Sequence, residues 1–516
     1  MHKLSLLLLT FFLSMCFGFT KLYRDKSSTT SIEPIAIATA KTIIDTTIDP
    51  RNGNSSISSC EKYIQENKER HIQELTDFLA IPSISSLPAH SKDMILAAEW
   101  LAEKLKKIGI TSTEVVATKG HPIVLSHWNA AKGKPTVLIY GHYDVQPVNE
   151  LDWTTPPFSA KRAEGRIYAR GAADDKGGIM IPIWAVEALL QKEGALPVNV
   201  IFVFDGEEEK GSPNFRQFLQ QHKDLLKADY AYNADATQYN DSIPSIWMSL
   251  RGGASLEFTV KTANTDAHSG IYGGKTANSA KAAAQIISSL YTPENKLAAK
   301  GFYDRVLPLT KSERERTRKI PYDENKEKKI IGTTADIGES EYSPLERVWY
   351  RPTVEVTGIW GGYTAPEGFA NIIPGATHVR LNCRLVPNQD GKEIIQLIKQ
   401  HIEKHCPKGA TVTFKEFDSY SSPIKFPATG SSFQYAYDIL TKLYNRQPLL
   451  TAIGGSIGAM IEIKEILGLY AYSFGFQQTD ENFHEPESIF PSVIINNALN
   501  AHKCASFRKG IISPFE

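Results

Sequence analysis

The chain has 516 residues, which is too long for one ordinary hydrophobic core, so more than one domain is expected. Hydrophobic residues make up 42% and charged residues 22%, as in a globular protein. Lys and Arg together number 57, and so do Asp and Glu, so no global field favours nucleic acid or an anionic membrane as a partner. The function must therefore depend on local groups of residues.

The N-terminus reads "MHKLSLLLLTFFLSMCFGF", a short basic start followed by an apolar run of roughly sixteen residues. Residues 1–19 are therefore predicted to be a signal peptide or an anchor, and residues 20–60, rich in Ser and Thr, a linker. We expect an exported protein, periplasmic or secreted, with an N-terminal membrane anchor or a lipid on Cys16 as alternatives. No second stretch is apolar for long enough to cross a bilayer.

Residues 61–250 are predicted to form the first part of an α/β catalytic domain. Helical apolar spacing marks residues 61–81, which stop at Pro82, and residues 93–108, which stop at Gly109. Three short apolar runs follow, "PTVLIYGHYD", "VNVIFVFDGEEE" and "ADYAYNADA". Between the first two lies "GGIMIPIWAVEALLQKEG", a helix that is apolar nearly all round and therefore buried. Such buried strands alternating with helices predict a mostly parallel sheet covered on both faces.

Residues 251–422 follow a different pattern. The strand "GASLEFTVKT" and the helix "TANSAKAAAQIISSLY" precede the strands "PTVEVTG" and "THVRLNCRLVP", the helix "DGKEIIQLIKQHIEKHC" and the strand "ATVTFKEF". The order β-α-β-β-α-β is the signature of a ferredoxin-like α+β sandwich, here interrupted by a charged, helix-leaning excursion over residues 292–350. The α/β pattern returns in residues 423–516, so a smaller domain is predicted to be inserted into a larger one.

Acidic and histidine side chains follow the three apolar runs and precede the buried helix. In open α/β sheets the ligand site lies at the carboxyl ends of the strands, so these groups should converge in one crevice. Carboxylates crowded there cannot all ionise unpaired. A pair of divalent cations would resolve this, and nitrogen with oxygen ligands suits zinc, whereas the scattered cysteines argue against a cysteine site. The residues are His142, Asp144, Asp174, Asp175, Asp205, Glu207, Glu208, Glu209 and Asp235, with His484 late in the chain.

Four blocks of this sequence, "GHYDVQP", "RGAADDKG", "DGEEEKGS" and "DAHSGIYGG", resemble the signature blocks of the co-catalytic di-zinc metallopeptidases. That family includes carnosine dipeptidases, aminoacylases and acetylornithine deacetylases. The resemblance runs from about residue 61 to the C-terminus and points to the carnosinase-like dipeptidase branch. It implies a zinc domain with an inserted lid domain that also dimerises, a dipeptide or short-peptide substrate, and two Zn²⁺ per subunit, with Mn²⁺ or Co²⁺ as alternatives.

The resemblance also implies roles for single residues. In the family pattern, His142 and Asp235 bind one zinc, Glu209 and His484 bind the other, and Asp174 bridges both. The last block departs from the pattern: after His484 this chain reads "HEPES" where the family has H-x-P-N-E.

Two further positions match the catalytic machinery of the family. Glu208 corresponds to the general base, and Asp144 to the carboxylate that orients His142 through its other ring nitrogen. Matching "GEEEKGS" to the pattern G-x-E-E-x-G-S selects Glu208 and Glu209, and leaves Glu207 as the variable position.

Further matches concern the substrate. His268 resembles the lid histidine that enters the partner subunit's active site of a homodimer and stabilises the oxyanion. Arg384 stands where the family binds the substrate carboxylate with an arginine. Asn371, Gly455 and Ser456 match further substrate contacts.

Alternatives remain at this stage. The same family includes N-acyl amino acid deacylases and carboxypeptidases. The stretch "GGSIG" also fits the nucleophile elbow of serine hydrolases, with Ser456 followed by Asp480 and His484 in the order that fold uses. A third alternative is a non-catalytic binding protein that kept the fold.

Overall fold

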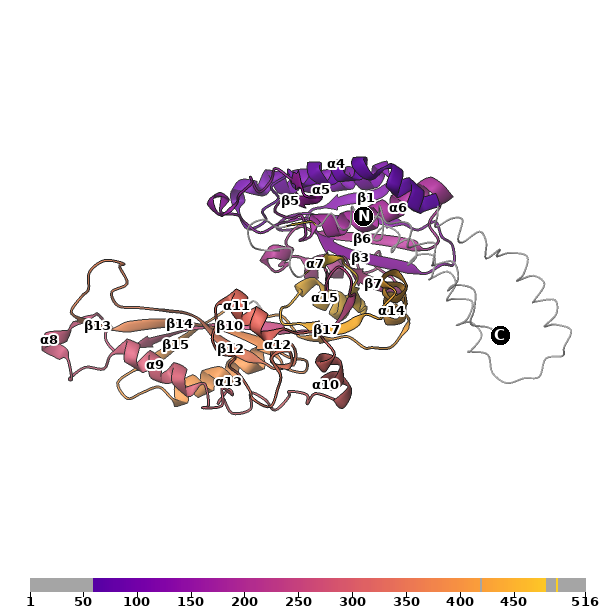
Figure 1. Cartoon of the computed structure of the whole chain (residues 1–516). Coiled ribbons are helices and arrows are strands. Elements are labelled where there is room, and N and C mark those ends of the chain that lie inside the picture. The colour runs from indigo at the N-terminus through magenta and orange to yellow at the C-terminus, as the bar shows by residue number, and fades with distance from the viewer. Residues whose placement is uncertain (1–58, 418–419, 479–488, 491–516) are drawn as a thin grey trace. The chain divides into compact units, whose positions relative to one another are not determined.

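The computed structural model describes residues 59–417, 420–478 and 489–490, which form two compact units (Figure 1). The first unit comprises residues 59–246, 427–449, 462–478 and 489–490 of the described chain, and the second comprises residues 247–417, 420–426 and 450–461. The second unit therefore starts and ends close to the predicted range 251–422 but also takes in residues 450–461. The predicted signal peptide and nearly all of the predicted linker lie outside the described residues.

A six-stranded sheet forms the centre of the first unit, with strand order β1-β2-β6-β3-β7-β18. Strands β6, β3, β7 and β18 run parallel to one another, whereas β1 and β2 add an antiparallel edge. The prediction of a mostly parallel sheet is confirmed. The strands are β1 (Ser112–Val116), β2 (Ile123–Trp128), β3 (Thr136–His142), β6 (Asn199–Asp205), β7 (Tyr230–Asn233) and β18 (Ala471–Ser473).

Helices cover both faces of this sheet (Figure 1). Helix α6, with α4 beside it, and helix α14 pack on the face that carries Ile139 and Tyr232, whereas Phe215 of α7 packs against Tyr140 on the opposite face. Helix α6 is buried from Lys176 to Leu189, as its all-round apolar sequence predicts, and it ends at Gly194 with a left-handed φ of 72°. The helix predicted to run to Pro82 is divided by a turn at Asn67. The helices are α4 (Lys68–Leu79), α5 (Ser91–Lys107), α6 (Lys176–Glu193), α7 (Phe215–Gln221) and α14 (Ser431–Tyr444).

The second unit contains a four-stranded antiparallel sheet with strand order β12-β14-β10-β15. Along the chain the elements come in the order β10, α9, β12, β14, α13, β15, which confirms the ferredoxin-like insertion. Alternate side chains of β10 and β14 pack with α9 and α13 in one core. The elements are β10 (Gly252–Lys261), α9 (Ser279–Ser289), β12 (Thr353–Trp360), β14 (Ala376–Leu385), α13 (Gly391–Lys404) and β15 (Thr411–Glu416).

Shorter elements complete the two units. The charged excursion forms three short helices, α10 (Lys311–Arg318), α11 (Glu324–Ile331) and α12 (Pro344–Tyr350). The remaining elements used below are β8 (Thr237–Gln238), β9 (Ser245–Leu250), β11 (Ala267–His268), α8 (Ser269–Tyr272), β13 (Ile372–Ile373), β17 (Leu449–Ile453), α15 (Gly458–Glu462) and β19 (Gln477–Gln478). The three cysteines in the described part of the chain, Cys60, Cys383 and Cys406, are free thiols.

Candidate active site

Three side chains from separate segments of the first unit form a group that could hold a metal ion. His142 is the last residue of β3, Asp174 precedes α6, and Asp235 follows β7. Their ligand atoms all lie within 4.8 Å of one another. Nε2 of His142 is 2.9 Å from Oδ1 of Asp174 and 4.0 Å from Oδ2 of Asp235. One nitrogen and two carboxylate oxygens at this spacing suit a divalent cation such as zinc.

The group carries more negative charge than its histidine can balance. Burial alone would lower the pKa of His142, but hydrogen bonds to Asp144 and Asp174 raise it well above the usual value. Burial raises the pKa of Glu208 well above its usual range. The charge of His142 lowers this pKa, but the charge of Asp235 raises it further. Carboxylates that hold each other's pKa up in this way are stabilised in the ionised form by a bound cation.

Asp144 connects His142 with the loop after β6. Its backbone carbonyl and its Oδ1 lie 3.1 Å and 3.3 Å from Nδ1 of His142. Its carboxylate also accepts hydrogen bonds from the backbone amides of Glu208 and Glu209, both at 3.1 Å, and from the hydroxyl of Ser85 at 2.6 Å. Asp144 is fully buried, so these contacts hold the two strand ends together away from water.

The carboxylates of "FDGEEEKGS" point to different partners. Oε1 and Oε2 of Glu209 accept from the backbone amide of Gln146 at 3.1 Å and from its side-chain amide at 2.7 Å. Glu207 instead accepts from Asn214 and pairs with Lys210 at 3.0 Å. Glu207 therefore has a local structural role and lies outside the candidate metal group.

Asp205 also belongs to the loop structure. It accepts from the hydroxyl of Ser212 at 2.6 Å and from the amide of Glu207 at 3.1 Å, and burial raises its pKa to about 7. Asp205 and Glu207 therefore stabilise the loop, whereas Glu208 lies beside the candidate metal group.

Several contacting residues were not singled out from the sequence. Ser85 and Gln146 bind Asp144 and Glu209, as described above. Gln477 donates from its side chain at 2.9 Å to Asp175, which is among the residues predicted to converge and which also accepts from the backbone amide of His142 at 3.3 Å. Gln146 lies inside the block "GHYDVQP", which is a signal that could have found it. Ser85 and Gln477 lie outside every block.

A second group has the spacing of a metal site and consists of His71, Glu74 and Glu187. In this group the carboxylates are already paired with basic side chains of the protein. Lys104 pairs with both glutamates at 2.8 Å, and Arg70 pairs with both at 2.6 Å. These two cations neutralise the carboxylates, so this group is an ion-pair network.

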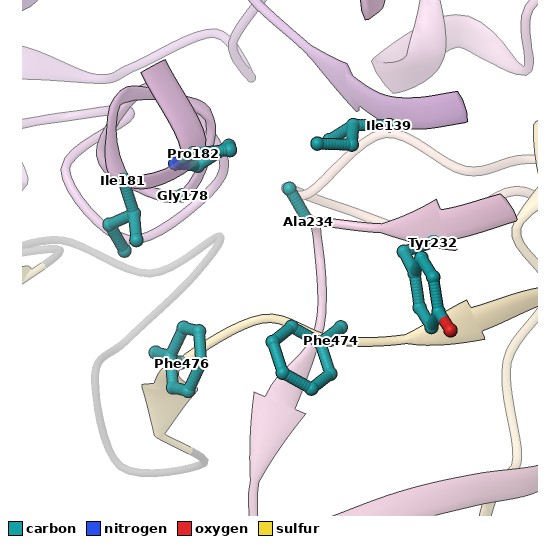
Figure 2. A pocket seen from close by; sticks show the side chains of 8 residues that line it. All are labelled: Ile139, Gly178, Ile181, Pro182, Tyr232, Ala234, Phe474 and Phe476. Atoms are coloured by element: carbon teal, nitrogen blue, oxygen red, sulfur yellow. The ribbon is translucent and has the colours of Figure 1, made fainter. Parts of the chain in front are cut away.

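A small apolar pocket lies between α6, β3, β7 and the segment after β18 (Figure 2). None of the candidate catalytic residues lines it, and its side chains offer no carboxylate or imidazole. It is lined by Ile139, Gly178, Ile181, Pro182, Tyr232, Ala234, Phe474 and Phe476.

Two of the predicted substrate residues lie on a two-stranded ribbon of the second unit. His268 in β11 pairs with Ile372 in β13, and the carbonyl of Asn371 accepts from the amide of Ser269 at 2.9 Å. His268 is exposed, and its Nδ1 accepts from the amide of Gly270 at 3.1 Å, at the start of α8. The ribbon therefore places His268 and Asn371 side by side.

The other three predicted substrate residues surround Arg251. The amide of Arg251 donates to the carbonyl of Gly455 at 3.1 Å, and the hydroxyl of Ser456 donates to the carbonyl of Arg251. The charge of Arg384 is close enough to lower the pKa of Arg251, which burial and this repulsion bring to about 10. The backbone of Arg384 pairs with Gly253 and Thr353 in the sheet, whereas its guanidinium forms no hydrogen bond or ion pair within the described chain and is available to an anion.

The serine-hydrolase alternative has little support from this geometry. The hydroxyl of Ser456 is engaged by a backbone carbonyl, whereas a nucleophilic serine donates to a base. Asp480 and His484, the other members of that set, lie outside the described residues, as does His484 in its role as a predicted metal ligand.

Comparison with protein families finds two matching models. Residues 249–410 match a model described as a peptidase dimerisation domain. Residues 123–285 match the model of peptidase family M28. The first match covers most of the ferredoxin-like insertion, and the second covers the segments that contain His142, Asp174 and Asp235.

Known proteins are similar over most of the chain. The Cys-Gly metallodipeptidase DUG1 of Candida albicans is 27% identical, over 85% of this chain and 94% of its own. The Beta-Ala-His dipeptidase of Rattus norvegicus is 27% identical, over 66% of this chain and 72% of its own. The crystal structure of the M20 family metallo-carboxypeptidase Sso-CP2 from Sulfolobus solfataricus superimposes with a TM-score of 0.73 at 30% identity, covering 83% of this chain and 96% of that chain.

The prediction of an exported protein is wrong as judged from these relatives, because the yeast Cys-Gly dipeptidases are cytosolic enzymes. In the parts of the chain that the structure describes, no helix is both long enough and apolar enough to cross a membrane. The apolar N-terminal run from which export was predicted lies outside those parts.

The similarity to the Sulfolobus solfataricus enzyme extends over nearly all of that enzyme and over both units of this chain. The relatives of similar identity from Candida albicans and Rattus norvegicus are named dipeptidases. The chain is therefore a hydrolase that belongs to the M20 family of metallopeptidases, and it is similar to the dipeptidases of that family.

Proposed function

We propose that this protein hydrolyses the amide bond of dipeptides or short peptides with two divalent cations bound at the ends of β3 and β7. The observation that carries the proposal is the convergence of His142, Asp174 and Asp235 beside Glu208. The donor set fits a metal, because it mixes nitrogen with oxygen and leaves its negative charge unbalanced. The names of the relatives, Cys-Gly and Beta-Ala-His dipeptidases, support dipeptides as substrates.

His142 and Asp235 would hold one cation, Glu209 and His484 the other, and Asp174 would bridge them. Zinc suits these ligands, and manganese and cobalt are the alternatives. Asp144 would fix the ring of His142 through Nδ1, so that Nε2 faces Asp174 and the cation.

The bound cations would lower the pKa of a water molecule and polarise the scissile carbonyl. Glu208 would take the proton from that water with its carboxylate and then donate the proton to the nitrogen of the leaving amine. The protein itself would form no covalent intermediate, since water is the nucleophile. Adjacent Glu208 and Glu209 would thus divide two tasks, proton transfer and metal binding.

Substrate residues would come from the second unit. Arg384 would bind the substrate carboxylate, with Asn371 and the Gly455–Ser456 segment as further contacts. His268 would stabilise the oxyanion in the active site of a second subunit, which requires a homodimer. The match of residues 249–410 to a dimerisation domain and the exposure of His268 support this arrangement.

A screen of dipeptides, N-acyl amino acids and longer peptides, with metal content measured on the same samples, tests the proposal. We expect the highest kcat/KM for dipeptides, loss of activity with a chelator, recovery with Zn²⁺, Mn²⁺ or Co²⁺, and no labelling by a fluorophosphonate. Full activity in metal-free protein would refute the proposal, and so would inactivation by the fluorophosphonate.

Removal of a C-terminal residue from longer peptides is the second candidate, because the Sulfolobus solfataricus relative is named a carboxypeptidase. The same screen of substrates distinguishes dipeptidase activity from carboxypeptidase activity. A carboxypeptidase would cleave tripeptides and longer peptides at least as well as dipeptides, whereas a dipeptidase would lose activity as the N-terminal side is extended.

A further inference from the structure

The side chain of Gln477 is fully hydrogen-bonded inside the first unit, close to the candidate metal group. It is 3% exposed. Its Nε2 donates to Oδ1 of Asp175 at 2.9 Å and to the carbonyl of Ala234 at 3.3 Å. Its Oε1 accepts from the amides of Phe476 at 2.9 Å and Ala236 at 3.3 Å. Both donors and both lone pairs of the amide are thus in use.

The partners of this amide flank one predicted metal ligand. Ala234 and Ala236 are the residues before and after Asp235, so the amide of Gln477 bonds the backbone on both sides of that aspartate. A backbone held at two adjacent peptide groups leaves Asp235 only its side-chain torsions to vary. Gln477 therefore helps to set the direction of its Cβ, together with the side chain of Asn233, which bonds both the amide and the carbonyl of Asp235.

Asp175, which bonds Gln477, also contacts the backbone at or beside two other predicted ligands, His142 and Asp174. It is fully buried, it is the neighbour of Asp174 in the chain, and its Oδ2 accepts from the backbone amide of His142 at 3.3 Å. The pair of Gln477 and Asp175 consequently contacts the backbone at, or next to, His142, Asp174 and Asp235.

Two glycines leave room for this pair. A Cβ on Gly178 would collide with Oδ1 of Asp175 and lie 2.6 Å from Nε2 of Gln477, and a Cβ on Gly141 would lie 2.7 Å from Oδ2 of Asp175. Close approach of this kind is a reason for glycine at a fixed position. Gly178, Ala234 and Phe476, labelled around the pocket in Figure 2, mark the surroundings of Gln477.

We propose that Gln477, acting through Asp175, is a positioning residue that fixes the spacing of His142, Asp174 and Asp235 for metal binding. The proposal rests on the proposed function, in which those three residues bind the cation. Removing a partner that orients metal ligands typically weakens metal affinity by about 10–100-fold. A glutamine with a merely structural role would change stability and leave metal affinity unchanged.

Gln238 provides a matched control. It is 2% exposed, lies in β8, which pairs with β19, and uses its amide in the same way, donating to the carbonyl of Gly475 and accepting from the amide of Ser245, both at 2.7 Å. None of these bonds involves a residue of the candidate metal group or Asp175.

The test is a titration of the metal-free full-length protein with Co²⁺ alone, followed by the visible absorption of the bound ion. We expect Gln477→Leu to raise the Kd for Co²⁺ by about 10–100-fold, and Gln238→Leu to leave it within about twofold of the parent. Gln477→Glu keeps the length of the side chain but places an oxygen instead of the NH₂ group against Asp175. It should therefore show the same loss of Co²⁺ affinity, and it replaces the leucine variant in the test if that variant does not fold.

An unchanged Kd in a folded Gln477 variant would overturn the positioning role, and so would an equal loss in Gln238→Leu. A failure of the proposed function would be seen in the parent protein itself, which would then bind no Co²⁺ and hydrolyse no dipeptide.

Discussion

The backbone amide of Glu208 donates a 3.1 Å hydrogen bond to Oδ1 of Asp144, whose backbone carbonyl contacts the ring of His142. Because Oδ2 of Asp144 also accepts from Glu209, this carboxylate ties the end of β3 to the loop after β6. In the proposed mechanism, a change at Asp144 therefore moves the metal ligand and the general base together.

Replacing this carboxylate by an amide is expected to disturb both groups. In Asp144→Asn, one oxygen that accepts from the loop becomes an NH₂ donor facing another donor, which costs about 1–3 kcal/mol locally. We expect a fall in kcat of at least about 100-fold and a Kd for Zn²⁺ raised by about 10–100-fold. Steady-state kinetics and metal titration measure the two effects. Asp77→Asn, an exposed aspartate of α4, is the control, and equal kinetics in the two variants would contradict the role of Asp144.

Glu208→Gln is expected to separate proton transfer from metal binding. A general base typically contributes about 10²–10⁴-fold to the rate, so kcat should fall by that factor while the metal content stays at the parent's value. Kinetics and elemental analysis of the same sample provide the measurement. Glu207→Gln is the comparison, because Glu207 bonds Asn214 and Lys210 instead of the candidate site. Parent-like turnover in Glu208→Gln would exclude it as the base.

His142→Ala is expected to lose metal as well as activity. The imidazole is the only nitrogen ligand in the described group of three, and two carboxylates alone hold zinc weakly. We expect at least one cation per subunit fewer than in the parent after dialysis. His222→Ala, at the end of α7, should keep the parent's metal content, because the ring of His222 stacks on Phe218 and bonds the carbonyl of Phe218, which is not a predicted metal ligand. Retention of both cations by His142→Ala would remove this residue from the ligand set.

The sequence predicts those features that depend on short-range patterns. The apolar runs that end at His142 and Asp205 are buried on both faces, so they can be recognised as parallel strands, and their carboxyl ends must meet at one edge of the sheet. The all-round apolar helix α6 and the order of elements in the second unit follow from periodicity in the same way.

Contacts between distant residues could not be predicted in this way. Gln477 and Asp175 are 302 positions apart, and no pattern in a single sequence indicates that a late glutamine bonds an early aspartate. Arg251 likewise stands at the boundary between two sequence patterns, and no pattern indicates that its side chain bonds the carbonyl of Gly454 and lies near the charge of Arg384. His484 lies outside the described residues, so its role as a metal ligand is a prediction.

The ion-pair network of Glu187 should make the first unit sensitive to acid. Burial alone would raise the pKa of Glu187, but hydrogen bonds and charges from His71, Lys104 and Arg70 outweigh it and hold the pKa well below the usual 4.5. A carboxylate whose pKa is lowered by folding stabilises the folded state fully above the unfolded pKa. That contribution is therefore complete above about pH 4.5 and is lost progressively as the pH falls below it.

Glu187→Gln tests this network. The substitution leaves the buried Lys104 and the partly exposed Arg70 with Glu74 as the remaining glutamate of the network, so the free energy of unfolding at pH 7 should fall by up to about 3–5 kcal/mol. The difference from the parent should shrink as the pH falls from 4.5 to 3, because the unfolded parent takes up a proton on Glu187 while the folded parent keeps this carboxylate ionised. Urea unfolding of metal-free protein, followed by circular dichroism at several pH values, gives both quantities. Glu103→Gln, which removes an exposed pair with Lys106, should cost less than about 1 kcal/mol. A pH-independent difference between the parent and Glu187→Gln would mean that the charge of Glu187 does not contribute to stability.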